Sequence, residues 1–395
     1  MPVSDRTSHS RPLRVLHVLP SLDQRYGGPL RIVLDLSAQA MELGMESEVV
    51  GLGRLDAPDN PLSTQFVHEL PGDPLSSFAY SAALRPWLRS NLKRFDGVVL
   101  HGVWTYVDWA AGEECQSAAV PYAQFPHGML EPWSVNGQGA GKLAKKWLYW
   151  WLRQKNTCEG ARFLLFTTNR ERELTMRLFA PRTGAMILTP YGVSAYPNGT
   201  ATPIRSDLQQ PDGRKIALFL GRVHPKKNID LLIEAWGRAR PALDWSLIIA
   251  GPVEPGYQPT LDRQIARWGL ERQVHFVGFV SAADKDYLLQ RAEWFLLPSS
   301  QENFGVAVLE AISQGCSVAI SDQVYLADYF SEGAEILPVS SDAWTQFIRD
   351  RMPDKVWRRE RAVADRKHLL EDFETSKITR NWVDSFQTMF GPAQQ

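Results

Sequence analysis

Short apolar runs alternate with segments of helical periodicity along almost the whole chain. The first apolar run is Arg14–Pro20, and the helical pattern that follows it, Leu30–Leu43, ends at Gly44. Such alternation is typical of βαβ units, in which buried parallel strands are joined by crossover helices. The glycine after the helix suits the left-handed residue that commonly ends one. The pattern therefore predicts an α/β fold built on parallel sheets.

The same alternation continues on both sides of one irregular stretch. Further strands are expected at Glu48–Leu52, Gly97–His101, Pro121–Phe125, Phe163–Thr167, Lys215–Leu220, Ser246–Ala250, Val274–Phe276, Trp294–Pro298 and Ser317–Ser321. Helices are expected at Ile229–Arg240, Thr260–Trp268, Ala282–Arg291, Val306–Gln314 and, with a break, over Lys355–Phe390. The stretch Ser194–Gly213 lacks periodicity and is typical of an interdomain linker. We therefore predict two doubly wound domains, 1–200 and 211–370.

Composition narrows the class of protein. A chain of 395 residues is too long for one ordinary core, which agrees with two domains. Its net charge of −1 gives no support for nucleic-acid binding. Cys115, Cys158 and Cys316 are too widely spaced for a disulfide framework or a metal-ligand pair. The polar N-terminus and the lack of long apolar runs favour a cytoplasmic protein without a spanning helix.

The most informative motif is Ser299–Gly315, SSQENFGVAVLEAISQG, which follows a predicted buried strand. Glu302 lies in the loop, and Glu310 comes eight positions later on the next helix. Free amides near Gly305 and Val306 would form an anion site at the start of that helix. The loop carboxylate can accept hydrogen bonds from sugar hydroxyls, and the helical one can bind a ribose diol. A capped helix with ordinary exposed glutamates explains the same residues, so both interpretations stand.

Two other strand-to-helix junctions carry residues suited to a phosphorylated ligand. Arg222 and Lys227, in LGRVHPKKNID, are spaced to hold a diphosphate. The guanidinium would offer two parallel N–H donors, and the ammonium would offer a compact positive charge. A solvated basic loop is the alternative. After the first strand, Gly27 and Gly28 allow a ligand to approach the backbone closely, although a tight turn without a ligand explains them equally well.

A histidine stands at the end of two predicted strands in the first half. They are His101 in LHGVWTYVD and His127 in FPHGMLEPW. A lone histidine at a strand end is more often a structural hydrogen-bonding group than a catalytic one. We favour a sugar or acceptor contact for His127 and leave the role of His101 open.

The sequence Asp284-Lys285-Asp286 matches the Asp-x-Asp pattern with which some transferases hold a metal ion. It falls in the first turn of a predicted helix, where acidic residues cap the helix and suit its dipole. Capping is the better explanation, so we expect no metal site here.

The segment Lys142–Lys155, KLAKKWLYWWLRQK, mixes cations with four aromatic residues. This composition suits contact with an anionic lipid surface or a lipid-linked acceptor. A core helix with a solvated basic face is the alternative, because the aromatic residues are nearly contiguous and not strictly on one side.

Taken together, these residues resemble the retaining GT-B glycosyltransferases of family 4, and the resemblance covers nearly the whole chain. It is carried by Gly27-Gly28, His127-Gly128, Gly221-Arg222 with Lys227 and, above all, Glu302-x7-Glu310 within ENFGVAVLEA. The stretch PHGMLEPW is similar to transferases of bacterial polysaccharide assembly. One departure is Asn228, where many relatives have glycine after the lysine.

The resemblance implies a GT-B fold, with two Rossmann-like domains facing a central cleft and a last helix, 376–395, crossing back to the N-terminal domain. It implies transfer of a hexose-type sugar from a UDP- or GDP-type donor to a glycan or lipid-linked acceptor of the cell envelope. In this family, retention is usually explained by front-face attack, in which the leaving phosphate takes the acceptor proton. That account needs neither a metal nor another cofactor.

The resemblance also assigns roles to single residues. The cations Arg222 and Lys227 would stabilise the diphosphate as leaving group, and Glu310 would hold the ribose. Glu302, together with backbone amides, would hold the transferred sugar, and His127 would touch it from the other domain. The catalytic set is then Arg222, Lys227, Glu302 and His127, and the donor-binding set is Gly27, Gly28, Asn303, Phe304, Gly305, Val306 and Glu310.

Two other functions stay open. A GT-B nucleotide-sugar epimerase would need further acid and base carboxylates in the cleft, and no clear set is visible. A catalytically silent partner that binds a nucleotide or glycan would have no need to keep Arg222, Lys227, Glu302 and Glu310 together.

Overall fold

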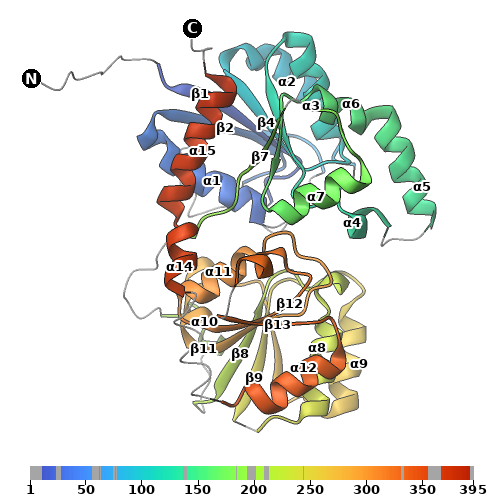
Figure 1. Cartoon of the computed structure of the whole chain (residues 1–395), viewed down its shortest axis with the longest axis vertical. Coiled ribbons are helices and arrows are strands. Elements are labelled where there is room, and N and C mark those ends of the chain that lie inside the picture. The colour runs from blue at the N-terminus through green and yellow to red at the C-terminus, as the bar shows by residue number, and fades with distance from the viewer. Residues whose placement is uncertain are drawn as a thin grey trace, which may run out of the picture. The chain divides into compact units, whose positions relative to one another are not determined.

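The computed structural model describes residues 11–23, 28–55, 62, 64–73, 76, 78–136, 140–183, 185–193, 202–208, 213–242, 244–330, 333–354 and 366–391. The chain divides into two compact units, each built around one sheet (Figure 1). The N-terminal unit comprises Met1–Thr189 and Ile378–Gln395, and the C-terminal unit comprises Pro190–Lys377. Both sheets are parallel throughout, which confirms the α/β fold and the doubly wound domains.

The N-terminal unit has a seven-stranded sheet in the order β3-β2-β1-β4-β5-β6-β7. Its strands are β1 (Leu13–Leu19), β2 (Met45–Leu52), β3 (Val67–Leu70), β4 (Gly97–His101), β5 (Tyr122–Phe125), β6 (Phe163–Phe166) and β7 (Ala185–Leu188). Its helices include α1 (Gly28–Ala40), α2 (Leu84–Asn91), α3 (Tyr106–Ala118), α4 (Pro132–Asn136), α5 (Ala140–Tyr149), α6 (Lys155–Gly160) and α7 (Asn169–Leu178). As expected, a left-handed Gly44 follows the helical segment that starts with α1.

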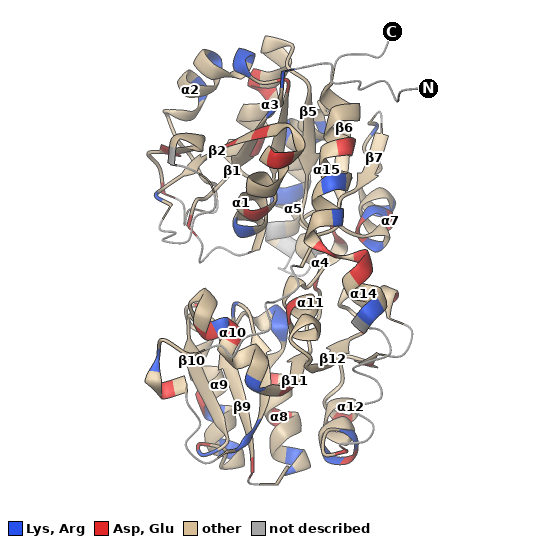
Figure 2. Cartoon of the chain, turned by 90° about the vertical axis from the view of Figure 1, so that its left-hand side faces the viewer, with Lys and Arg blue, Asp and Glu red and all other residues tan. Residues whose placement is uncertain are grey.

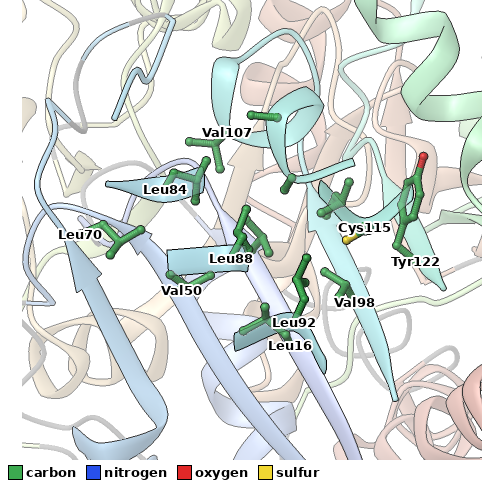
Figure 3. Close-up of a cluster of buried hydrophobic side chains, with 14 of the residues drawn as sticks. Leu16, Val50, Leu70, Leu84, Leu88, Leu92, Val98, Val107, Cys115 and Tyr122 are labelled. Carbon is green, nitrogen blue, oxygen red and sulfur yellow. The ribbon is translucent and has the colours of Figure 1, made fainter. Parts of the chain in front are cut away.

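Alternate residues of β2 face different cores of the N-terminal unit. Val50 and Leu52 pack into the cluster formed with α2 and α3, which contains Leu84 and Val107 (Figure 3). Val49 packs instead into the cluster formed with α1. This period of two places apolar side chains on both faces of the sheet, which is why the strands appear in the sequence as continuous apolar runs.

The C-terminal unit has a six-stranded sheet in the order β10-β9-β8-β11-β12-β13. Its strands are β8 (Lys215–Leu220), β9 (Trp245–Ala250), β10 (Val274–Gly278), β11 (Ala292–Leu297), β12 (Ser317–Ser321) and β13 (Ala334–Leu337). Its helices include α8 (Ile229–Ala239), α9 (Gln258–Trp268), α10 (Ala282–Arg291), α11 (Val306–Ser313), α12 (Ser341–Gln346) and α14 (Arg366–Asp372). Helices α8, α9 and α12 pack on one face of this sheet, and α10 and α11 lie on the other (Figure 1).

The last helix, α15 (Thr375–Phe390), belongs to the N-terminal unit from Ile378 onward. Its residues Trp382 and Phe386 are buried there. At Gly97 an added Cβ would lie 2.2 Å from the ring of Phe390, so only glycine lets the helix approach β4 this closely. Helix α15 is thus part of the N-terminal core from Ile378 onward.

Helix caps and charges follow the rules for such folds. The hydroxyl of Ser281 accepts a hydrogen bond from the amide of Asp284 at the start of α10, so Asp284 belongs to a cap, as expected. Acidic and basic residues are interspersed along the helices of both units (Figure 2). Among the described residues, no helix combines the length and apolar character needed to cross a membrane.

Candidate functional site

The strand order of the C-terminal unit brings two of the predicted loops together. The chain runs from β8 outward to β10, then returns so that β11 pairs directly with β8. The loops that follow β8 and β11 therefore lie side by side at the carboxyl ends of their strands. This reversal point is where ligands bind in open parallel sheets.

Three hydrogen bonds join these two loops. The amide of Ser300 donates to the carbonyl of Lys226 at 2.8 Å. The side-chain Nδ2 of Asn228 donates to the carbonyl of Pro298 at 2.8 Å and lies 2.7 Å from Oγ of Ser300. Asn228 adopts a left-handed φ of 52°, which glycine and asparagine tolerate best. Asn228, in place of the glycine of many relatives, therefore adds side-chain hydrogen bonds between the two loops.

Lys227 and Glu302 form an ion pair at the centre of this edge, with side chains only 12% and 19% exposed. Burial lowers the pKa of Lys227 well below its usual value, and repulsion from Lys226 and Arg222 lowers it further. A cation with so little solvent interacts strongly with an arriving anion. The structure therefore brings together two of the four predicted catalytic residues.

The loop after β11 ends at the N-terminus of α11, where the N-cap residue is a glycine. Gly305 at the N-cap position has a left-handed φ of 79° and no side chain with which to cap the first turn of α11. A Cβ at Gly305 would meet Glu302 Cγ at 3.3 Å. The amide of Val306 opens this helix, and the dipole there favours an anion.

The neighbours of Gly305 differ in what their side chains can do. Phe304 is 2% exposed and packs edge-on against Tyr191 and Phe373, so its side chain serves the core. The side-chain oxygen Oδ1 of Asn303 is buried and accepts no hydrogen bond within the described part of the chain. An unpaired buried acceptor is costly, and a ligand donor would satisfy it.

Glu310 lies in the second turn of α11 and forms an ion pair with Lys285 of α10. Both side chains are partly buried, at 19% and 26% exposed. The predicted ribose-binding carboxylate is therefore already held in place by a cation from a neighbouring helix.

Arg222 is more exposed than Lys227. Its guanidinium lies 3.6 Å from the carboxylate of Glu254, and its side chain is 44% exposed. The backbone beneath it is tightly packed, because a Cβ on Gly251 would lie 2.0 Å from the carbonyl oxygen of Gly221. Gly251 also has a φ of 138°, so glycine is required on both counts.

In the N-terminal unit, the two predicted histidines lie at or just after the ends of central strands. Gly27 lies outside the described residues, and Gly28 begins α1. His127 follows β5 with a left-handed φ of 52°. The amide of Gly128 donates to the fully buried carboxylate of Glu171 at 2.7 Å, which fixes this turn. His127 also lies 2.9 Å from His101, measured between ring nitrogens.

Comparisons with known proteins identify the family of the chain. The family model for glycosyl transferases group 1 matches residues 201–360, and the model for the glycosyl transferase 4-like domain matches residues 27–192. The fold matches that of Anabaena HepE, solved in complex with UDP and glucose, at a TM-score of 0.75 and 16% identity over 95% of this chain and 100% of that one. The chain is a GT-B glycosyltransferase of family 4.

Two curated relatives of this glycosyltransferase are named as mannosyltransferases. The GDP-mannose:cellobiosyl-diphosphopolyprenol alpha-mannosyltransferase of Xanthomonas oryzae pv. oryzae is 26% identical over 84% of each chain. The O-antigen chain mannosyltransferase B of Escherichia coli is 27% identical over 44% of this chain and 46% of its own length.

Several residues of the transferase that shape the site carried no distinctive signal in the sequence. Lys285 stands between two acids of a helix start, where it is indistinguishable from a surface lysine. Glu171 follows Thr168 at capping-box spacing, but its hydrogen bond to the turn after β5 depends on the fold. No group of three or more His, Cys, Asp or Glu side chains within the described ranges is arranged to hold a metal ion.

Proposed function

We propose that this glycosyltransferase moves a hexose-type sugar, with retention of configuration, from a nucleotide diphosphate donor to a lipid-linked glycan in cell-envelope or exopolysaccharide synthesis. The partly buried Lys227–Glu302 pair at the reversal point of the C-terminal sheet carries the proposal. The Xanthomonas relative, named for GDP-mannose and a diphosphopolyprenol acceptor, supports the donor and acceptor classes. Because HepE was solved with UDP, a UDP-linked sugar is the second candidate donor.

Donor binding would exchange the ion pairs of the free site. The diphosphate would take Lys227 and Arg222 as partners, and the amide of Val306 would add a donor. Glu302, released from the lysine, would then accept hydrogen bonds from hydroxyls of the transferred sugar. Glu310 would likewise turn from Lys285 to the ribose diol. Each carboxylate is thus held in place before the donor arrives, which lowers the entropy cost of binding.

The proposed step needs no protein nucleophile. The acceptor oxygen attacks C1 of the sugar on the face from which the diphosphate leaves. The bond from C1 to the diphosphate oxygen breaks, and the acceptor proton passes to that leaving oxygen. The leaving group gains negative charge, so preorganised cations stabilise the transition state, by several kcal/mol in comparable sites.

Thermal unfolding of the full chain with UDP, GDP, ADP, CMP and dTDP, each with and without EDTA, tests the donor site. A ligand present at a hundred times its Kd stabilises the native state by about 2.7 kcal/mol. We expect GDP or UDP alone to raise the midpoint, with no effect of EDTA. The shift should vanish in Arg222→Ala and persist in Arg263→Ala, which removes an exposed arginine from α9.

Other outcomes of that experiment would contradict the proposal. If no nucleotide shifts the midpoint, a silent binding partner becomes the better assignment. A shift that disappears in EDTA would show that a metal takes part in donor binding. Formation of an epimeric nucleotide sugar without acceptor would identify an epimerase.

We also propose that the N-terminal unit contacts an anionic membrane surface through the segment after α4. Leu148, Trp151 and Leu152 are 61%, 63% and 65% exposed. Cations lie among them: Lys155 stands 4.4 Å from the ring of Trp151, and Lys145 lines a pocket of about 410 Å³ together with Leu148 and Leu152. Exposed apolar side chains among cations suit an interfacial position on anionic lipid. These exposed apolar side chains distinguish the segment from a core helix that presents only basic residues to solvent.

Sedimentation with lipid vesicles tests this contact. We expect the full chain to bind phosphatidylglycerol vesicles and to leave phosphatidylcholine vesicles unbound, with binding weakened by salt. Replacing both Trp151 and Leu152 by serine should weaken binding at least about tenfold, since each buried side chain contributes about 1.5–3 kcal/mol. Ile204→Ser, which removes an exposed side chain of the C-terminal unit, is the matched control. Equal binding of both variants would contradict the assignment.

A further inference from the structure

The ion pair between Glu310 and Lys285 uses only part of the hydrogen-bonding capacity of its two groups. Nζ of Lys285 donates to Oε1 of Glu310, and neither charged group has another hydrogen bond among the described residues. Oε2 of Glu310 and two of the three ammonium protons are therefore left over. Both side chains are partly exposed, so a ligand can reach these groups.

The leftover groups fit a ligand that both donates and accepts hydrogen bonds. A phosphate oxygen only accepts, and the carboxylate would repel it. A hydroxyl donates one proton and also accepts through its oxygen. Two neighbouring hydroxyls can therefore donate to the carboxylate of Glu310 while their oxygens accept from the ammonium of Lys285. The pair is complementary to a vicinal diol.

The pair also lies where the ribose of a bound nucleotide can reach it. Glu310 comes four residues after Val306, whose amide opens α11. At the rise of an α-helix this is about 6 Å along the axis from the anion site. Lys285 reaches the same carboxylate from α10, on the same face of the sheet. A nucleoside diphosphate held at Val306 by its phosphates can thus meet both groups with its ribose.

The turn that carries Lys285 is fixed by its neighbour Asp284, which is 2% exposed. The carboxylate of Asp284 accepts from the hydroxyl of Ser281 at 2.8 Å. It also accepts from the backbone amides of Ile204 and Arg205 at 2.8 and 3.1 Å. The first acid of the Asp-Lys-Asp sequence therefore anchors the first turn of α10, and the lysine projects from a rigid element.

We propose that Lys285 is the second half of the ribose site, and that the ribose diol enters between its ammonium and the carboxylate of Glu310. The hydroxyls donate to the carboxylate, and their oxygens accept from the ammonium. This inference rests on the proposed function, in which Glu310 holds the ribose. The ion pair of the free site is replaced by hydrogen bonds of both groups to one diol, so neither charge loses its partner on binding. Lys285 thereby favours ribonucleotides over nucleotides without the diol.

Titration calorimetry of the full chain measures this preference. The probes are GDP and UDP and the 2′,3′-dideoxy form of each, which keeps the base and the diphosphate and lacks the diol. We expect the ribonucleotide to bind about tenfold to a hundredfold more tightly than its dideoxy form, because hydrogen bonds to charged groups are strong. Lys285→Met should weaken the ribonucleotide about tenfold and change the Kd of the dideoxy form less than about threefold.

Lys215→Met is the matched control. Lys215 belongs to the same unit, is 29% exposed and pairs with Asp244 at 2.6 Å. It stands at the start of β8, at the other end of the strand from the site. We expect this change to leave the Kd of each nucleotide within about twofold of the wild type. If Lys285→Met fails to fold, Lys285→Gln replaces it and should weaken the ribonucleotide about threefold to tenfold.

A double variant separates a direct contact of Lys285 from an effect through Glu310. In Glu310→Gln the carboxylate is gone, and the ammonium of Lys285 can still donate to the diol. Adding Lys285→Met to Glu310→Gln should weaken the ribonucleotide at least about threefold further. No further loss would show that Lys285 only holds the carboxylate, and would overturn the proposal.

Equal effects of Lys285→Met on a ribonucleotide and on its dideoxy form would also overturn the proposal. The titrations need no acceptor, so they are independent of sugar transfer. A chain that binds a ribonucleotide through Lys285 and transfers no sugar would contradict the proposed function alone. Sugar transfer by a chain whose nucleotide affinity is unaffected by Lys285→Met would contradict this inference alone.

Discussion

Replacing Lys227 by methionine should slow sugar transfer about a thousandfold. The side chain is 12% exposed and pairs with Glu302 at the point where the loops after β8 and β11 meet. Removing one preorganised charge-stabilising group from an active site costs about 10²–10³ in kcat. We expect a loss of kcat near the upper end of that range, because the ammonium of Lys227 is poorly solvated and carries a full charge. Initial rates with the donor identified by thermal unfolding would measure it.

The adjacent lysine supplies the matched control. Lys226→Met removes the same charge one residue earlier and leaves intact the backbone carbonyl that accepts from Ser300. We expect its turnover to stay within about threefold of the wild type. If the two variants lose activity equally, a general effect of positive charge in the loop would replace the specific role of Lys227.

The pKa of Lys227 gives a second signature of the same role. Burial lowers this pKa, and only the protonated form neutralises a diphosphate. The bound diphosphate favours the ammonium and raises the pKa, so binding takes up a proton once the pH exceeds the pKa of the free site. The affinity for the nucleoside diphosphate should therefore fall as the pH rises in the wild type. In Lys227→Met this part of the pH dependence should be absent, as calorimetry in two buffers would show.

The sequence predicted the central strands well and missed short edge strands. β4, β8 and β12 have the bounds expected from their apolar runs, because strands buried on both faces lack polar interruptions. The edge strand β3 carries the exposed Glu69, β13 carries the exposed Ile336 beside a partly buried Glu335, and β7 is half-buried throughout. Such short, partly exposed runs have no clear period.

The candidate site was predictable as a set of residues and not as a set of contacts. The spacing of Glu302 and Glu310 and the cations after β8 stand in the sequence. Their partners depend on strand order, which places β11 beside β8 and not beside β10. The Lys285–Glu310 pair depends on the packing of α10 beside α11, and the contacts of His101 with His17 and His127 depend on the pairing of β4 with β1 and β5.

His17, His101 and His127 should make the N-terminal unit less stable in mild acid. Each ring stays neutral in the folded chain and titrates near pH 6.5 in the unfolded chain. Below pH 6.5 the unfolded state binds the extra protons, so stability is lost as the pH falls toward 3. Each such group contributes about 1.4 kcal/mol per pH unit.

One buried carboxyl opposes this trend. Burial raises the pKa of Asp108 to about 7, so the folded state holds an extra proton between about pH 4 and 7 and gains stability as the pH falls. This offsets one histidine and leaves a net slope of about 3 kcal/mol per pH unit between pH 6 and 4. The loss between pH 6 and 4 is then about 6 kcal/mol, which is enough to unfold a domain whose stability lies near the lower end of the usual range of about 5–15 kcal/mol.

Urea unfolding of the full chain at pH 7, 6 and 5, followed by hydrogen exchange in peptides from β1, β4 and β5, measures that slope. His17→Phe removes one titrating ring and should reduce the slope by about 1.4 kcal/mol per pH unit. Val50→Ala, a cavity in the core between β2 and α2, should lower stability equally at every pH and keep the slope. A slope unaffected by His17→Phe would mean that this ring is charged in the folded protein, which its position against Trp382 and Phe386 argues against.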